Sequence, residues 1–225
     1  MRISVIVPVL NEERTIASTL AALSRLAPDE VIVVDGGSTD RTHDIVGRMP
    51  ATLLTAPAGR AQQMNHGTHT AQGEVLLFLH ADTRLPASAL ADIRAAMADP
   101  RCVGGRFDVR FDRDEWMFRL IGTLINLRSR LTQGATGDQA IFVRRTVFEE
   151  LGGFPNLPLM EDIALARLLK RQGRVACLRS QVITSARRWE RDGVWRTVLK
   201  MWAFRLLFLA GVSPTRLKRF YGDAR

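Results

Sequence analysis

Short apolar runs alternate with helix-like segments through the first half of the chain. The runs cover residues 3–7, 31–34, 51–55 and 75–79. Runs this short and this rich in Val, Ile and Leu are typical of strands that a sheet buries on both faces. The segments between them carry apolar residues at helical spacing. The alternation predicts an α/β fold with a mostly parallel, Rossmann-like sheet and helices on both faces.

The second half of the chain is less regular. The expected elements are helices over 115–131 and 161–171, a buried strand over 140–144, and strands over 106–111, 175–178 and 182–185. Of these, the segment 106–111 is predicted to lie at a sheet edge. The 225 residues, 46% of them hydrophobic, suit one domain with a small appendage.

The composition narrows the class of partner. A net charge of +9 is compatible with nucleic acids, anionic membranes or phosphorylated substrates. No dense basic run is interleaved with stacking aromatic residues, however, so we expect no nucleic-acid partner. Cys102 and Cys177 lie far apart without metal-ligand spacing, which argues against structural zinc and a disulfide framework. We expect a cytoplasmic protein, with peripheral contact at the inner face of the membrane as the alternative.

Polar residues follow the expected strands at the edge where open parallel sheets bind ligands. Asn11 and Glu12 follow the first run, Asp35 ends the second, and Asp82 follows the fourth. Asn11 can also cap the first helix. Carboxylates at strand ends can accept hydrogen bonds from a nucleobase or ribose, and their oxygens suit Mg²⁺ or Mn²⁺. The sequence therefore predicts a polar ligand site at this edge.

Seven short motifs occur in a fixed order. They are PVLNEE at 8–13, VDGGSTD at 34–40, GRAQQMN at 59–65, HADT at 80–83, GDQ at 137–139, MED at 160–162 and RRW at 187–189. The ordered set resembles glycosyltransferase family 2, whose fold is called GT-A. It is most similar to small bacterial members of the arsenosugar-type or radical-SAM/selenodomain-associated kind.

The resemblance implies a single GT-A domain over residues 1–190, followed by a C-terminal helical extension over 191–225. The nucleotide-binding half would span about 1–100 and the acceptor half about 101–190. The implied activity is an inverting transfer of a sugar from a nucleoside diphosphate sugar, most simply a UDP-sugar, to an unidentified acceptor. A divalent cation, Mn²⁺ or Mg²⁺, would assist the departure of the diphosphate.

The resemblance also implies a set of donor-binding residues. Asp35 would bind the uridine part, with Glu12 and Pro8 beside the base, and Arg60 suits the diphosphate. Asp82 matches the last acid of the family's DxD motif and is the expected metal ligand. His80 replaces the first acid of that motif, which either weakens the ribose contact or changes it to an imidazole donor. The full donor set is Pro8, Asn11, Glu12, Asp35, Gly36, Arg60, Gln63, Asn65, His80, Ala81, Asp82, Arg188 and Trp189.

On the acceptor side, the resemblance implies that Asp162 is the catalytic base and that Glu161 helps to seat the acceptor. Two acids in a first helical turn also favour the helix dipole without any catalytic role. The triplet Gly137, Asp138 and Gln139 would face the sugar or the acceptor. Asp138 is the second candidate for the base.

Two other functions remain open. A sugar nucleotidyltransferase would need a glycine-rich, basic loop directly after the first strand, whereas this chain has Asn-Glu-Glu at 11–13. A catalytically silent nucleotide-sugar-binding subunit is the other alternative, because His80 departs from the motif. The acceptor could be a sugar, a lipid carrier, a small metabolite or a selenium or arsenic compound.

The segment 194–209 is very apolar. On a helix, Arg196 and Lys200 share a face and Arg205 lies roughly opposite them. One buried stripe does not account for this pattern, so we expect the segment to pack on two sides. One side would meet the domain, and the other a second subunit in a homodimer, which we favour over a membrane surface.

Overall fold

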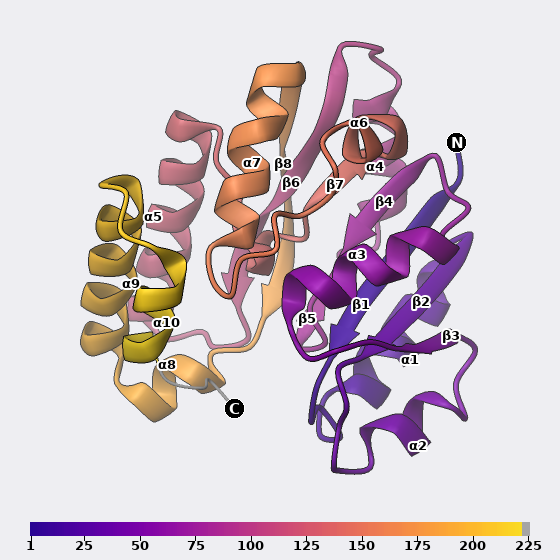
Figure 1. Ribbon diagram of the computed structural model, residues 1–225, viewed down its shortest axis with the longest axis horizontal. Helices are drawn as coiled ribbons and strands as arrows, with labels where there is room; N and C mark the ends of the chain where they lie inside the picture. The colour runs from indigo at the N-terminus through magenta and orange to yellow at the C-terminus, as the bar shows by residue number, and fades with distance from the viewer. Residues whose placement is uncertain (222–225) are drawn as a thin grey trace.

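The computed structural model describes residues 1–221 (Figure 1). The strands of this part of the chain are β1 Ile3–Val9, β2 Glu30–Asp35, β3 Thr52–Thr55, β4 Val75–Phe78, β5 Thr83–Arg84, β6 Cys102–Phe111, β7 Phe142–Arg144 and β8 Arg174–Thr184. The helices are α1 Ile16–Leu26, α2 Thr42–Val46, α3 Arg60–Thr70, α4 Ala89–Met97, α5 Trp116–Thr132, α6 Arg145–Glu150, α7 Glu161–Gln172, α8 Arg187–Asp192, α9 Val194–Leu209 and α10 Pro214–Tyr221, with a 3-10 turn, η1, at Gly137–Gln139.

The strands form one sheet in the order β3-β2-β1-β4-β7-β6-β8-β5. β1 pairs in parallel with both β2 and β4, and β2 pairs in parallel with β3. β7 is antiparallel to β4 and β6, whereas β6 and β8 are parallel to each other. The predicted α/β fold with a mostly parallel sheet is confirmed.

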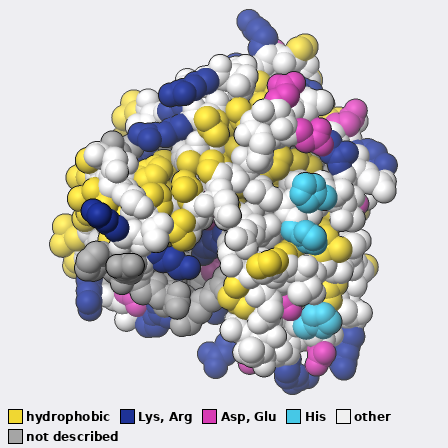
Figure 2. Space-filling model, viewed as in Figure 1, with side chains coloured by type: hydrophobic (Ala, Val, Ile, Leu, Met, Phe, Trp, Pro, Cys, Tyr) yellow, Lys and Arg dark blue, Asp and Glu magenta, His cyan; other side chains and the backbone are white. Residues whose placement is uncertain are grey.

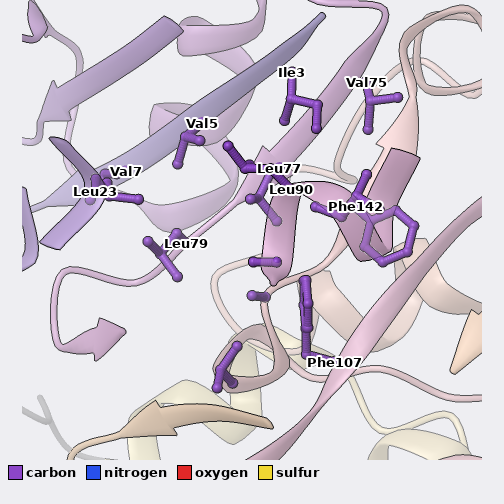
Figure 3. Close-up of a cluster of buried hydrophobic side chains, with 14 of the residues drawn as sticks. Ile3, Val5, Val7, Leu23, Val75, Leu77, Leu79, Leu90, Phe107 and Phe142 are labelled. Atoms are coloured by element: carbon purple, nitrogen blue, oxygen red, sulfur yellow. The ribbon is translucent and has the colours of Figure 1, made fainter. Parts of the chain in front are cut away.

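Helices cover both faces of this sheet because its central strands are apolar on both sides. Ile3, Val5 and Val7 of β1 point to the face covered by α1, α2 and α4, where Leu77 of β4 joins the same core (Figure 3). Ile6 points to the opposite face, where α3, α6 and α7 pack. The alternation along β1 therefore builds two cores, as expected for a strand with period two.

α3 lies close against the sheet. A Cβ on Gly67 of this helix would lie 2.8 Å from Cγ2 of Ile6 and 3.0 Å from Cγ2 of Val34, which is closer than such atoms approach. Glycine at this position therefore lets the helix rest directly on β1 and β2. This packing places Arg60, the first residue of α3, at the carboxyl end of the sheet.

β6 lies inside the sheet between β7 and β8, so its prediction as an edge strand was wrong. Its residue Arg106 is fully buried and forms an ion pair with Asp108. Arg130 of α5 contributes a second cation to Asp108. Buried charges of this kind are tolerated when they are paired. The two strands predicted at 175–178 and 182–185 are one strand, β8.

α5 substitutes for a neighbouring strand along part of β6. β7 pairs only with Gly104 and Gly105 of β6. Further along, Asn126 of α5 accepts a hydrogen bond from the Val109 amide at 2.8 Å and donates one to the Val109 carbonyl at 2.9 Å. The side-chain amide thus satisfies backbone groups that would otherwise lie buried and unpaired.

The C-terminal helices fold back onto α5 (Figure 1). Trp189 of α8 packs with Phe111 and Phe118, and Val198 and Met201 of α9 pack against the same cluster. Within residues 1–221, no helix combines the length and the hydropathy that crossing a membrane requires. The domain boundary at 190 stays a prediction, and residues 222–225 of the expected extension lie outside the described part.

Candidate active site

A cavity of about 540 Å³ lies at the carboxyl ends of β1 and β4. Residues from both predicted halves of the domain line it. The expected site residues among them are Pro8, Glu12, Arg60, His80, Ala81, Asp82, Gly137, Asp138, Glu161, Asp162, Arg188 and Trp189. The fold therefore brings together twelve residues that the motifs had singled out, from segments far apart in the sequence.

Asn11 ties together the two loops that follow β1 and β2. It has a left-handed backbone (φ 54°), and its side-chain oxygen accepts a hydrogen bond from the Thr39 amide at 2.8 Å. Its own amide donates to Oγ of Ser38 at 2.9 Å. α1 begins only at Ile16, so the prediction that Asn11 caps this helix was wrong. A link between two loops replaces the cap.

Asp35 belongs to the same pair of loops. Its Oδ1 accepts hydrogen bonds from the Ser38 amide at 2.9 Å and the Ser38 hydroxyl at 2.6 Å. The side chain is 2% exposed and does not line the cavity. Its predicted contact with the nucleoside stays a prediction.

Gln63, Asn65 and Gln139 hold backbone segments near the cavity without lining it. Nε2 of the fully buried Gln63 donates to the carbonyls of Val9 and Val34 at 2.7 and 2.8 Å, which joins the ends of β1 and β2. A Cβ on Gly36 would lie 3.0 Å from this amide. Asn65 exchanges two hydrogen bonds with the backbone of Phe154, and Gln139 caps η1. Their ligand contacts, and that of Gly36, stay predictions.

His80 and Asp138 face each other across the cavity wall. Nδ1 of His80 lies 3.1 Å from Oδ1 of Asp138. Burial favours the neutral acid. His80 opposes this effect of burial through its hydrogen bond and its charge, and Arg60 and Arg188 add their charges. Together they lower the pKa of Asp138 to about 2. Gly137 packs under the imidazole, because a Cβ there would lie 2.5 Å from Nε2 of His80.

Asp82 lies in the cavity among charged groups of both signs. Burial raises the pKa of its carboxyl; the charge of His80 opposes this, and the neighbouring carboxylates of Asp138 and Glu12 raise it further. A divalent cation would relieve that repulsion, and its preference for oxygen ligands fits Asp82. Among the described residues, no group of three or more His, Cys, Asp or Glu side chains could hold a metal. A cation here would therefore share its shell with substrate oxygens and water.

Asp162 is positioned by two backbone amides. Its Oδ2 accepts a hydrogen bond from Gly137 and its Oδ1 one from Ile163, both at 2.7 Å. The bond from Gly137 joins the start of α7 to η1, and the two bonds together fix the carboxylate at the cavity. Its neighbour Glu161 is 6% exposed, and burial together with the charge of Asp162 raises the pKa of the Glu161 carboxyl.

α8 reaches across to the loop after β1. Arg187 forms an ion pair with Glu12 at 3.3 Å, and the same Oε2 of Glu12 accepts a hydrogen bond from Thr15 at 2.9 Å. Trp189 is 7% exposed and packs edge-on against Phe111, with ring centroids 5.4 Å apart. Trp189 therefore shapes the cavity wall mainly through packing.

Four arginines that line the cavity were not among the predicted site residues: Arg128, Arg187, Arg191 and Arg205. Arg187 belongs to the last motif, from which only its neighbours Arg188 and Trp189 were chosen. Arg205 had one signal, namely its place on the helix face opposite Arg196 and Lys200. Arg128 had none, because it lies in a helix that a sequence pattern describes only as apolar-rich.

The family model described as Glycosyl transferase family 2 matches residues 4–152 of this chain. The chain belongs to glycosyltransferase family 2. The match covers the strands and loops that form the β1, β2 and β4 side of the cavity, as well as Asp138. The resemblance to the arsenosugar-type subgroup stays a prediction.

A relative from Mycobacterium bovis (strain BCG / Pasteur 1173P2) carries the name "PGL/p-HBAD biosynthesis glycosyltransferase". It is 31% identical over 164 residues, which cover 67% of this chain and 62% of the relative. The chain thus spans less than two thirds of that relative's length.

Two solved structures share the fold. Staphylococcus aureus TarS (residues 1–349) superposes with a TM-score of 0.65 and 21% identity, over 92% of this chain and 66% of that one. Glucosyl-3-phosphoglycerate synthase from Mycobacterium tuberculosis, in complex with Mn²⁺, UDP and glucosyl-3-phosphoglycerate, superposes with a TM-score of 0.59 and 20% identity, over 80% and 70%. These likenesses confirm the predicted GT-A fold.

Proposed function

We propose that this family 2 chain transfers a sugar from a UDP-sugar to a nucleophilic acceptor, with inversion at the sugar carbon. The observation that carries the proposal is the cavity that joins the expected donor residue Asp82 to the expected base Asp162. The related synthase was solved with Mn²⁺ and UDP, which supports this choice of donor and cation.

The donor is proposed to occupy the β1, β2 and β4 side of the cavity. Arg60 and Arg188 line it and can pair with the diphosphate through charge-assisted hydrogen bonds. Asp82 would hold a divalent cation, which supplies charge neutralisation of the leaving diphosphate when it is bound. Glu12, Pro8 and the Asp35 loop lie on the side proposed for the nucleoside.

The acceptor is proposed to approach from the α7 side. Asp162 takes the proton of the acceptor hydroxyl. The hydroxyl oxygen forms a bond to the sugar carbon, and the bond between that carbon and UDP breaks on the opposite face. Glu161 and Asp138 line the same region and can orient the acceptor and the sugar. The acidic loop 11–13 after β1 disfavours a sugar nucleotidyltransferase, and donor hydrolysis by the purified chain would rule out a silent subunit.

A thermal-shift panel tests this function directly. Purified chain is heated with UDP, UDP-sugars and other nucleotide sugars, with and without Mn²⁺. A ligand at a hundred times its Kd stabilises by about 2.7 kcal/mol, which for a chain of this size raises Tm by roughly 5–10 °C. We expect the largest shift for a UDP-sugar with Mn²⁺. No shift with any uridine nucleotide would contradict the proposal.

Asp35→Ala is expected to weaken UDP binding by about 1.5–3 kcal/mol, the usual effect of losing a hydrogen bond to a charged group. The measurement is calorimetric titration with UDP, with Asp44→Ala on the exposed side of α2 as the matched control. Ser38→Ala removes the local hydroxyl contact but keeps the carboxylate. If Ser38→Ala weakens UDP as much as Asp35→Ala does, the loop geometry and not a direct contact is responsible.

The outer face of α9 carries Trp195, Leu199 and Leu206, which are 59–70% exposed. The sequence favours a homodimer over a membrane contact, and we propose that this face of α9 binds a second copy of the chain. Light scattering in detergent-free buffer should give the mass of a dimer, and Leu199→Glu should return it to a monomer. A monomer that sediments with anionic liposomes would favour the membrane alternative, and one that does neither would refute both.

A further inference from the structure

The cavity extends away from the donor side into an apolar groove between α5 and α9. Leu124, Leu127 and Leu131 of α5 and Trp202 of α9 line it, and each is more than half exposed. Residues that line a cavity and are also exposed mark its open side. Figure 2 shows hydrophobic side chains gathered over the region where Figure 1 places these helices. An exposed apolar opening on an active-site cavity indicates a ligand with an apolar part.

Two arginines lie where this groove meets the proposed catalytic centre. Arg128 of α5 and Arg205 of α9 both line the cavity together with Asp162. A Cβ on Gly134, just after α5, would lie 3.5 Å from a terminal nitrogen of Arg205, so Arg205 reaches across to the end of α5. The charges of both helices thus converge at the inner end of the groove.

Arg128 is incompletely satisfied at this position. Its Nε is buried and has no hydrogen-bond partner. Burial and then the nearby charge of Arg205 lower the pKa of the Arg128 guanidinium to about 10, and Asp162 only partly offsets them. An anion bound between Arg128 and Arg205 would accept a hydrogen bond from the buried donor. It would also offset the repulsion between the two cations.

We propose that the acceptor is an anionic amphiphile, with its anionic group bound by Arg128 and Arg205 and its aliphatic chain lying in the groove between α5 and α9. This inference rests on the proposed transferase function and specifies its acceptor class. The anionic group holds the head of the amphiphile beside Asp162. A hydroxyl group on that head then passes its proton to Asp162 as its oxygen bonds to the sugar carbon and the bond to UDP breaks. The second copy proposed for the outer face of α9 has a net charge of +9 and supplies no anion for Arg128 and Arg205, so it does not fill the inner end of the groove.

The test compares three probes that separate charge from chain: octyl phosphate, 1-octanol and inorganic phosphate. Each is titrated with saturating UDP and Mn²⁺, so that the diphosphate site is filled, and again without them. Tryptophan fluorescence reports binding because Trp189 and Trp202 line the cavity. We expect octyl phosphate to bind at least tenfold more tightly than either other probe. Equal binding of octyl phosphate and inorganic phosphate, or of octyl phosphate and octanol, would overturn the proposal.

Variants locate the anion. Arg128→Gln and Arg205→Gln should each weaken octyl phosphate at least tenfold and leave octanol unchanged. The matched controls are Arg119→Gln on α5 and Arg196→Gln on α9, which are exposed and lie outside the cavity. Loss of octyl phosphate binding in the controls as well would refute a defined anion site. Thermal shift measures UDP binding in every variant. A variant that binds UDP but not octyl phosphate bears on this inference alone, whereas loss of UDP binding bears on the transferase proposal.

Discussion

Asp162→Asn is expected to lower turnover by at least about a hundredfold while UDP-sugar affinity stays close to that of the wild type. A general base typically contributes ~10²–10⁴-fold, and the amide has almost the same shape but no basicity. Because the substitution acts on the transition state, kcat and kcat/KM should fall together. Donor turnover is measured with saturating UDP-sugar and a nucleophilic acceptor.

The structure adds a second consequence to this substitution. The Asp162 carboxylate accepts backbone amides with both oxygens, from Gly137 and from Ile163. The asparagine amide offers one acceptor oxygen, so one of these N–H groups loses its partner at a cost of about 1–3 kcal/mol. A lower Tm with intact UDP binding is therefore expected. Asp114→Asn, on an exposed segment, is the matched control and should change neither quantity.

Three outcomes would contradict the assigned roles. If Asp162→Asn keeps near wild-type turnover while Glu161→Gln is inactive, the two acids have exchanged roles. If both variants are fully active, the base lies elsewhere and Asp138 becomes the candidate. A change in acceptor use alone is the expected result for Glu161→Gln, because that side chain is proposed to seat the acceptor.

Asp82→Ala is expected to abolish the gain in UDP affinity and turnover that Mn²⁺ provides. Asp82 offers a carboxylate within the cavity, and the described residues hold no ligand cluster that could replace it. Lewis-acid stabilisation of a leaving diphosphate is worth several kcal/mol, so turnover with Mn²⁺ should fall to the metal-free rate.

To test Asp82, Mn²⁺ is titrated at a fixed concentration of UDP-sugar, and turnover and the thermal shift are measured at each Mn²⁺ concentration. Asp114→Ala is the control and should retain the full response to the metal. UDP without metal should bind Asp82→Ala at least as well as the wild type, because one negative charge has left the cavity. Undiminished metal dependence in Asp82→Ala would show that the cation binds elsewhere.

The local pattern of the sequence was enough to predict the α/β fold and much of the donor side. Period-two burial and short apolar runs are properties of neighbouring residues, so β1, β2 and β4 could be expected directly. Ligand sites follow the carboxyl ends of such strands, which indicated Glu12 and Asp82 before any contact was known. The ordered motifs then led to the family that the comparison confirmed.

The structural partners of several motif residues could not be read from that pattern. Asn11 suits a helix cap by residue type, but its oxygen meets Thr39 in another loop. Gln63 lies in a polar helix segment, yet it is fully buried because the carbonyls of Val9 and Val34 converge on it. Such hydrogen bonds depend on where the loops meet in space, and residue type alone does not decide them.

The tertiary structure alone decided the order of the strands and the acceptor side of the cavity. β6 was predicted to be an edge strand, but it lies inside the sheet, where Asp108 pairs with Arg106 of the same strand and with Arg130 of α5. Arg128 and Arg205 come together because α9 folds back across α5. Burial, pairing and repulsion of charges act over distances of a few ångströms in space, and segments far apart in sequence reach that separation only once the chain has folded.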